Sequence, residues 1–189
     1  IMETYSVNQI NKDVLLQSYL KHLIFSEIQK VGFELFGVAK VTSIDEAIFL
    51  REWISKNYHA DMDWFSKTIH LRTDVKKWFS EGISIIAVGE NYYHKCENTF
   101  LALYAHGTDY HIRIRKKLNQ VASFLNEFVT DMKFKISVDT SPVYEKYWAK
   151  KAGLGWQGKN TLIINPKYGS WFNIGLLVVN FALPEDVEV

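Results

Sequence analysis

The stretch VDTSPVYEKYWAKKAGLGWQGKNTLIINPKYGSWFNIG, residues 138–175, decides the fold more than any other part of the chain. Alternating residues at 134–138 predict a strand that delivers Asp139 to its end, and Pro142 suits the first turn of a helix that reaches about Lys151. Three glycines then predict a compact turn, and apolar residues at 161–165 and 171–183 predict further strands. The stretch therefore predicts strands and a helix around one polar corner.

The residues before this stretch alternate between helical and strand-like patterns. Apolar positions with a helical period predict helices over residues 8–31 and 111–132, whereas residues 33–41 and 83–89 read as strands. Ser43 and Glu46 suit a capping box for a helix that reaches about Lys56, and residues 58–65 suit a loop or short helix. Without a repeat or linker, residues 1–189 predict one α/β (α+β) domain with a mixed sheet flanked by helices.

Composition excludes several classes of protein. The 189 residues include 22 basic and 21 acidic side chains, so a net charge of +1 gives no bulk attraction to nucleic acid or membranes. One cysteine, Cys96, excludes a disulfide framework and an iron–sulfur cluster held by this chain alone, and it suggests a reducing compartment. No apolar window is long enough to span a bilayer, which predicts a cytoplasmic protein without membrane contact.

Asp139 and the glycine-rich turn are the two candidates for chemistry, and each has a plainer explanation. A carboxyl group at a strand end beside aromatic residues could donate a proton, but Asp139 could equally cap the following helix. The turn AGLGWQGKN, residues 152–160, could offer backbone amides to a polar ligand. It could also be a compact turn in which the glycines only relieve the backbone.

The remaining polar clusters give weaker signals. The six histidines lack an HExxH pattern or a zinc-ligand spacing with a cysteine, so no metal site built from protein ligands is expected. His106, Asp109 and His111 could line a pocket or begin a helix, and Met62 could contact a cofactor or fill the core. One helix face carries four cations, for which a solvated face is favoured over a binding patch: Arg113, Arg115, Lys116 and Lys117.

Three segments carry a family resemblance. Residues 139–175 resemble the hallmark region of the epoxyqueuosine reductases, which finish queuosine on tRNA. YHADMDWF, residues 58–65, and YAHGTDYHIRIRKKL, residues 104–118, resemble two further segments of that family, in the same order along the chain. The resemblance covers most of residues 15–184.

The resemblance implies an oxidoreductase that uses cobalamin to remove the epoxide oxygen from epoxyqueuosine. It also implies that the cobalamin-binding domain resembles nitroreductase-like domains and the corrinoid-binding domains of reductive dehalogenases. Asp139 matches the family's proton donor. It implies tRNA and an electron donor as partners, and 4Fe-4S clusters in the full-length family. The residues that it assigns to cofactor binding are Met62, Tyr104, Asp109, Asp139, Gly158, Lys159, Asn160, Ile163 and Ser170.

Departures from the family pattern leave other functions open. Ala60, Phe65 and Val75 stand where the family usually has Gly, Met and Pro. The family continues into ferredoxin-like and helical-repeat regions that this sequence does not include, so the resemblance predicts that the chain is the catalytic, cobalamin-binding part of a longer protein. A non-catalytic corrinoid module and a flavin-dependent reductase remain as alternatives. Four cations beside the predicted site could contact tRNA phosphates: Lys146, Lys150, Lys151 and Lys159.

Overall fold

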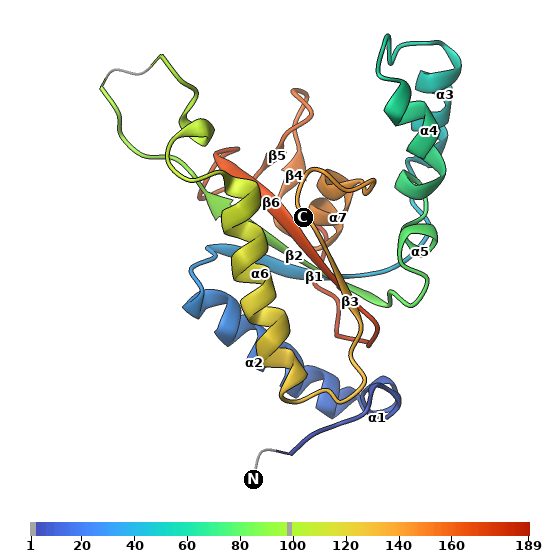
Figure 1. Cartoon of the computed structure of the whole chain (residues 1–189), viewed down its shortest axis with the longest axis vertical. Coiled ribbons are helices and arrows are strands. Elements are labelled where there is room, and N and C mark those ends of the chain that lie inside the picture. The colour runs from blue at the N-terminus through green and yellow to red at the C-terminus, as the bar shows by residue number, and fades with distance from the viewer. Residues whose placement is uncertain (1–2, 98–99) are drawn as a thin grey trace.

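A computed structural model describes residues 3–97 and 100–189, which form a sheet with helices on both faces (Figure 1). Two helices, α1 (Val7–Lys12) and α2 (Val14–Lys30), precede strand β1 (Leu35–Lys40). Three short helices, α3 (Ala47–Ser55), α4 (Asp63–Arg72) and α5 (Val75–Trp78), then lead to β2 (Ser84–Asn91). The rest of the chain adds the 3₁₀ turn η1 (Leu103–Ala105), α6 (Tyr110–Asn126), β3 (Phe134–Ser137), α7 (Glu145–Lys151), β4 (Trp156–Gln157), β5 (Ile163–Ile164) and β6 (Phe172–Val179).

The central sheet has the order β1-β2-β6-β3, and β4 and β5 form a separate hairpin. This confirms the α/β class, but every pairing between these strands is antiparallel, where the sequence predicts a mixed sheet. The longest of these pairings joins β2 and β6 along their whole lengths, from Ser84 opposite Val179 to Asn91 opposite Phe172.

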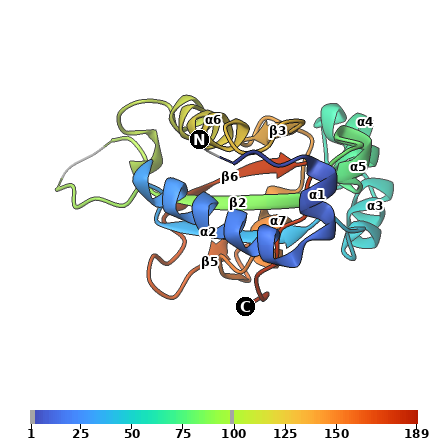
Figure 2. The ribbon, with the colours of Figure 1, turned by 90° about the horizontal axis from the view of Figure 1, so that it is seen from below.

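Alternating residues of the strands point to opposite faces of the sheet and pack into two separate hydrophobic cores. Ile86 and Val88 of β2 pack with α2 and α6, whereas Ile85 and Ala87 of the same strand pack with α7. Figure 2 shows α6 and α7 on opposite sides of the strands. Gly37 of β1 allows α7 to approach closely, since a Cβ atom there would lie 1.9 Å from the carbonyl oxygen of Ala152.

Several predicted helix boundaries are wrong, and local caps or contacts with distant residues explain them. The first helix is interrupted at Asp13, whose side chain accepts hydrogen bonds from the amides of Leu15 and Leu16 and so begins α2. The capping box at Ser43 is not formed. Its other member, Glu46, binds Lys150 at 2.6 Å instead.

Two more boundaries move for the same kind of reason. Helix α6 ends at Asn126 rather than near Met132, because the following turn pairs with Tyr5, whose amide donates to the carbonyl of Phe128 at 2.7 Å. Helix α7 begins at Glu145 rather than at Pro142. The backbone turns back at Asp139, and the residues between them form tight turns.

Two peripheral features bear on the functional site. Helices α3, α4 and α5 form an arm at one end of the sheet, and the segment after β2 projects at the opposite end (Figures 1 and 2).

Near the C-terminus, Asp186 binds the free edge of β1: its amide donates to the Val38 carbonyl, and its carboxylate accepts from the Val38 amide, both at 2.8 Å. Lys21 binds the same carboxylate at 2.7 Å. None of the helices in the described ranges is long and apolar enough to cross a membrane.

Candidate functional site

A cavity of about 290 Å³ lies where the start of α6, the start of α7 and the β5–β6 region meet. Its wall combines aromatic, apolar and ionisable side chains, which suits a small polar organic group. The side-chain amide nitrogen of Asn173, in this wall, is buried without a hydrogen-bond partner. The lining residues are Tyr92, Tyr104, Tyr110, Asp139, Glu145, Lys146, Leu162, Ile163, Ser170, Phe172, Asn173 and Ile174.

Asp139 lies at the mouth of this cavity. Its φ angle of 58° falls in the left-handed region that non-glycine residues rarely adopt, and its side chain is 67% exposed. One carboxylate oxygen, Oδ2, accepts hydrogen bonds from the Tyr110 hydroxyl at 3.2 Å and faces His111 Nε2 at 3.3 Å. The side chain therefore points toward α6 and does not cap α7, whose N-cap is Tyr144.

His111 connects Asp139 to a second carboxylate. Its Nδ1 atom lies 2.7 Å from Asp109 Oδ1, which also caps α6 by accepting from the His111 amide at 2.8 Å. Partial burial lowers the pKa of His111, but the hydrogen bonds and charges of Asp109 and Asp139 outweigh it and raise that pKa. The hydrogen bonds from His111 lower the pKa of Asp109. The imidazolium form is thus favoured between two carboxylates.

Glu145 contacts the backbone of Asp139 rather than its side chain, and its environment is different. Burial raises the pKa of Glu145 to about 7, although hydrogen bonds from the Ser137 hydroxyl and the Asp139 amide lower it. The Asp139 amide donates to Glu145 Oε1 at 2.8 Å, so Glu145 also holds the strained backbone in place. Near neutral pH, this carboxyl group is protonated about half of the time.

The arm contributes a cation to the same region. Burial lowers the pKa of Arg72, at the end of α4, while the negative charges of Glu145 and Asp139 act in the opposite direction. The guanidinium lies over the rings of Trp64 and Phe65, at 5.1 and 4.6 Å from their centres. Arg72 therefore joins the arm electrostatically to the carboxylates.

The predicted site residues fall into four places, and one of them is the tip of the β4–β5 hairpin. Tyr104, Asp139, Ile163 and Ser170 line the cavity. Asp109 lines an adjoining cavity of about 330 Å³, whose wall shares Tyr104 and Tyr110 with the first. Met62 instead begins α4 on the arm, where it is 38% exposed.

The glycine-rich turn lies outside the cavity wall. Gly158, Lys159 and Asn160 form the tip of the β4–β5 hairpin, in which the Gly158 amide donates to the Leu162 carbonyl at 2.8 Å. The Gly158 amide is therefore used within the hairpin, and cofactor contact at Gly158, Lys159 and Asn160 stays a prediction. Asn160 also uses its side-chain oxygen within the hairpin, accepting from the Leu162 amide at 3.2 Å. The plainer explanation, a compact turn, accounts for these contacts.

Two predictions about cations also need correction. Arg113 and Lys117 are not a solvated face, because each lies 2.7 Å from the carboxylate of Glu90, which is only 5% exposed. Lys150 and Lys151 are engaged by acidic residues, with Glu46 at 2.6 Å from Lys150 and Glu188 at 2.9 Å from Lys151.

The sequence analysis misses Glu145, Tyr110 and Arg72 as members of the site. Tyr110 and Arg72 lie 29 and 67 positions before Asp139, so no local spacing connects them with it. Glu145 follows Asp139 by six residues, but the pattern predicts it inside a helix that starts at Pro142. Only the backbone reversal at Asp139 shows that the Glu145 carboxyl group lies beneath that residue.

Comparisons with known proteins identify relatives of the chain. Residues 72–140 match the family model described as "Epoxyqueuosine reductase QueG, DUF1730". An epoxyqueuosine reductase from Cyclobacterium marinum is 36% identical over 164 residues, which cover 83% of this chain and 53% of that protein. One from Synechocystis is 39% identical over 159 residues, covering 79% and 54%. The chain thus spans about half the length of these curated relatives.

Solved structures agree with the sequence matches. The structure of epoxyqueuosine reductase from Streptococcus thermophilus has a TM-score of 0.80 and 25% identity, covering 90% of this chain and 48% of that one. An epoxyqueuosine reductase crystallised with a tRNA stem loop has a TM-score of 0.79 at 23% identity, with the same coverage. A reductive dehalogenase described as B12-dependent shares the fold at a TM-score of 0.62 and 11% identity, covering 92% and 21%.

Proposed function

We propose that this chain, which belongs to the epoxyqueuosine reductase family, holds the epoxide of a modified tRNA base and delivers protons to it during reduction. The observation that carries the proposal is the row Asp109–His111–Asp139 at the cavity mouth, with separations of 2.7 and 3.3 Å. All three residues lie within the segment matched by the family model, residues 72–140.

The chemistry requires a proton source at this position. Converting an epoxide to an alkene breaks two C–O bonds and releases the oxygen as water. The conversion consumes two electrons and two protons. His111 in its charged form can pass the proton on Nε2 to Asp139 Oδ2, which then donates it to the departing oxygen. Asp109 stabilises the charged imidazole from the other side. Tyr110 helps to hold the accepting oxygen in place.

The size of the cavity supports a small headgroup as its occupant. A volume of about 290 Å³ is at the lower end of ligand pockets and suits a hydroxylated ring rather than a whole nucleotide. An oxygen of the ligand could accept a hydrogen bond from the unpartnered amide of Asn173. Lys146 of the wall and Lys159 at the hairpin tip are our candidates for tRNA phosphate contacts, since Lys150 and Lys151 are already paired.

A corrinoid is the cofactor that we propose, and the fold shared with a B12-dependent reductive dehalogenase supports it. When bound, cobalamin supplies electrons through its cobalt ion. Such a group is too large for the cavity, so it would lie at the mouth, where Tyr104 is 51% exposed. Trp171, which is 44% exposed, contacts Tyr92 of the cavity wall with ring centres 5.9 Å apart. The wall residues Tyr104, Ile163 and Ser170 would hold the corrinoid at the mouth, while Met62 and the hairpin tip remain predicted contacts.

The electrons must come from outside the described chain. The sequence contains one cysteine, far fewer than the eight or so that two 4Fe-4S clusters need. We therefore propose that an external or covalently linked iron–sulfur protein reduces the cofactor.

The test uses cob(II)alamin, a chemical reductant and an epoxyqueuosine-containing stem-loop RNA. The chain should shift the visible spectrum of cob(II)alamin to the base-off form, and Asp139→Asn should bind it equally well. That variant should reduce the epoxide at least about 100-fold more slowly, because an amide cannot donate the proton. Glu127→Gln, an exposed acid beyond the end of α6, is the matched control and should keep the full rate.

Each outcome has a separate meaning. A full rate for Asp139→Asn would contradict its role as the proton donor. A spectrum that does not change would contradict the corrinoid. Cobalamin binding without reaction in any variant would favour a non-catalytic corrinoid module, and a yellow protein would favour a flavin reductase.

A further inference from the structure

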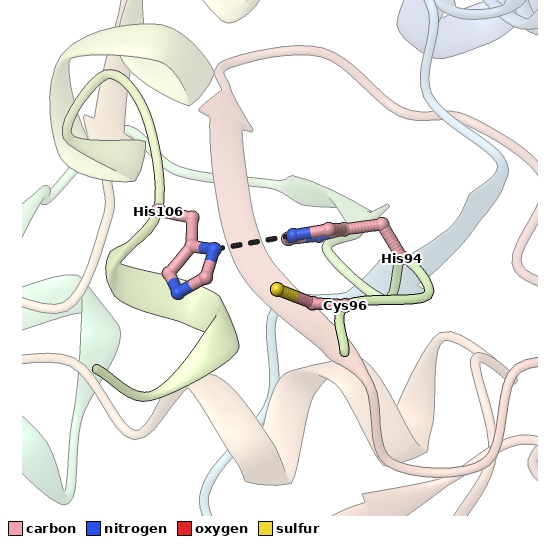
Figure 3. A group of neighbouring side chains, drawn as sticks. All are labelled: His94, Cys96 and His106. Atoms are coloured by element: carbon pink, nitrogen blue, oxygen red, sulfur yellow. Dashed lines mark hydrogen bonds between the residues drawn. The ribbon is translucent and has the colours of Figure 1, made fainter. Parts of the chain in front are cut away.

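Three side chains that commonly bind metals meet in the segment between β2 and α6, outside the carboxylate row (Figure 3). His94 and Cys96 come after β2 with one residue between them, and His106 follows η1. The imidazole nitrogens and the sulfur all lie within 4.8 Å of one another. The spacing of the histidines predicts no such site, but the fold of this segment brings the three residues together.

The hydrogen bonds of the two rings indicate where their protons lie. His94 Nδ1 is 3.2 Å from the Tyr92 carbonyl oxygen, and His106 Nε2 is 3.3 Å from the Leu101 carbonyl oxygen. A carbonyl oxygen can only accept, so each of these nitrogens carries the proton of its ring. The other nitrogens, His94 Nε2 and His106 Nδ1, are then left with lone pairs.

These two lone pairs face each other. His94 Nε2 and His106 Nδ1 lie 3.1 Å apart, a distance at which two acceptors repel unless a cation lies between them. The carbonyl contacts are also the arrangement that orients histidines toward a metal, since a hydrogen bond from the outer nitrogen fixes the ring and turns the inner nitrogen toward the ion. A cation at this point would be stabilised by both inner nitrogens.

We propose that His94, Cys96 and His106 bind a zinc ion, with water as the fourth ligand. Zinc bonds of about 2.0 Å to nitrogen and about 2.3 Å to sulfur place tetrahedral ligands roughly 3.3 to 3.6 Å apart. The nitrogens already have nearly this separation. Cys96 is exposed, so its side chain can rotate the remaining distance. Two imidazoles and one thiolate are a donor set that zinc accepts.

The ion would act on the cavity wall. Tyr92 and Tyr104 line the cavity, with ring centres 6.4 Å apart, and each lies two residues from a proposed ligand. Zinc would connect His94 and Cys96 to His106 and so fix the positions of the two tyrosines relative to each other. This role is independent of the proposed reaction.

The single cysteine makes the test simple. In the chain without a histidine tag, a thiol reagent such as Ellman's reagent reports on Cys96 alone. Stoichiometric Zn²⁺ should slow this reaction more than 10-fold, Mg²⁺ should not, and a chelator should reverse the effect. Co²⁺ should give the near-ultraviolet thiolate charge-transfer absorption of a tetrahedral site.

Variants identify the ligands. The double variant His94→Ala/His106→Ala should lose the protection, whereas the exposed control His22→Ala should keep it. An unchanged rate with Zn²⁺ in the parent chain would overturn the proposal and leave a shared proton between the two rings. Equal protection in the double variant would also overturn it, because the metal would then bind elsewhere.

Discussion

Two glutamates are removed from water in this protein, and their surroundings differ in one respect. Glu90 on β2 is 5% exposed and has two cations, Arg113 and Lys117, each at 2.7 Å. Among the residues that the structure describes, Glu145 on α7 has only the neutral donors of Ser137 and the Asp139 amide within hydrogen-bond distance. Because neutral donors do not balance a charge, burial raises the pKa of Glu145 to about 7.

The comparison distinguishes a carboxyl group that stabilises the fold from one that can exchange a proton. A carboxylate that is paired with two cations fixes α6 against the sheet. A carboxyl group that titrates near pH 7 can exchange a proton, and this one lies directly beneath Asp139. The same residue type therefore serves packing in one place and chemistry in the other.

The largest effect is expected where the structural pair is broken. Replacing both cations, in Arg113→Met/Lys117→Met, should lower the free energy of unfolding by about 4 kcal/mol, because Glu90 is left buried and uncompensated. Urea denaturation measures this loss. If the double variant does not fold, Lys117→Met alone should lose roughly half as much. Lys116→Met, on the exposed side of α6, is the control, and an equal loss there would remove the distinction.

The next effect concerns the dependence of stability on pH. The pKa of Glu145 in the folded chain is about 7, above the ordinary value of 4.5, so the unfolded chain loses this proton first as pH rises. Stability from this group is therefore full below about pH 4.5 and is lost through pH 7, by about 3 kcal/mol at most. Glu145→Gln should remove this part of the decline. Urea titrations from pH 4.5 to 8 should show it, and parallel curves for variant and parent would contradict it.

The smallest expected effect concerns the contribution of one hydrogen bond to the pKa of Glu145. The hydrogen bond from Ser137 lowers the pKa of Glu145, so Ser137→Ala should raise that pKa further above 7. We expect a free-energy change of about 1 kcal/mol, typical of one hydrogen bond. Carbon-detected NMR titration of the glutamate carboxyl groups measures the shift. A lower pKa in the variant would mean that the Ser137 hydroxyl stabilises the protonated form of Glu145 rather than its carboxylate.

The sequence predicts correctly those strands and helices whose formation depends mainly on their own residues. Strands β2 and β6 follow from their apolar runs, since both faces of the sheet are buried. The end of α6 and the unused capping box could not be predicted, because Tyr5 and Lys150 decide them from far along the chain.

The same limit applies to the candidate site. The motifs draw attention to Asp109 and Asp139, which the structure places on either side of His111. They do not indicate the pKa of Glu145, because burial depends on the whole fold. They also do not indicate that the amide of Gly158 is used by the hairpin in which it lies, and contact of this residue with a cofactor stays a prediction.

The contact between Asp186 and β1 has a consequence for the behaviour of the protein in solution. The outer edge of a sheet is a template on which another chain can add a strand and so begin aggregation. Asp186 occupies both polar backbone groups of Val38 in the middle of that edge, and Lys21 neutralises the carboxylate that does so. A visiting strand would have to displace an ion pair before it could extend the sheet, so this short C-terminal segment protects the chain against self-association.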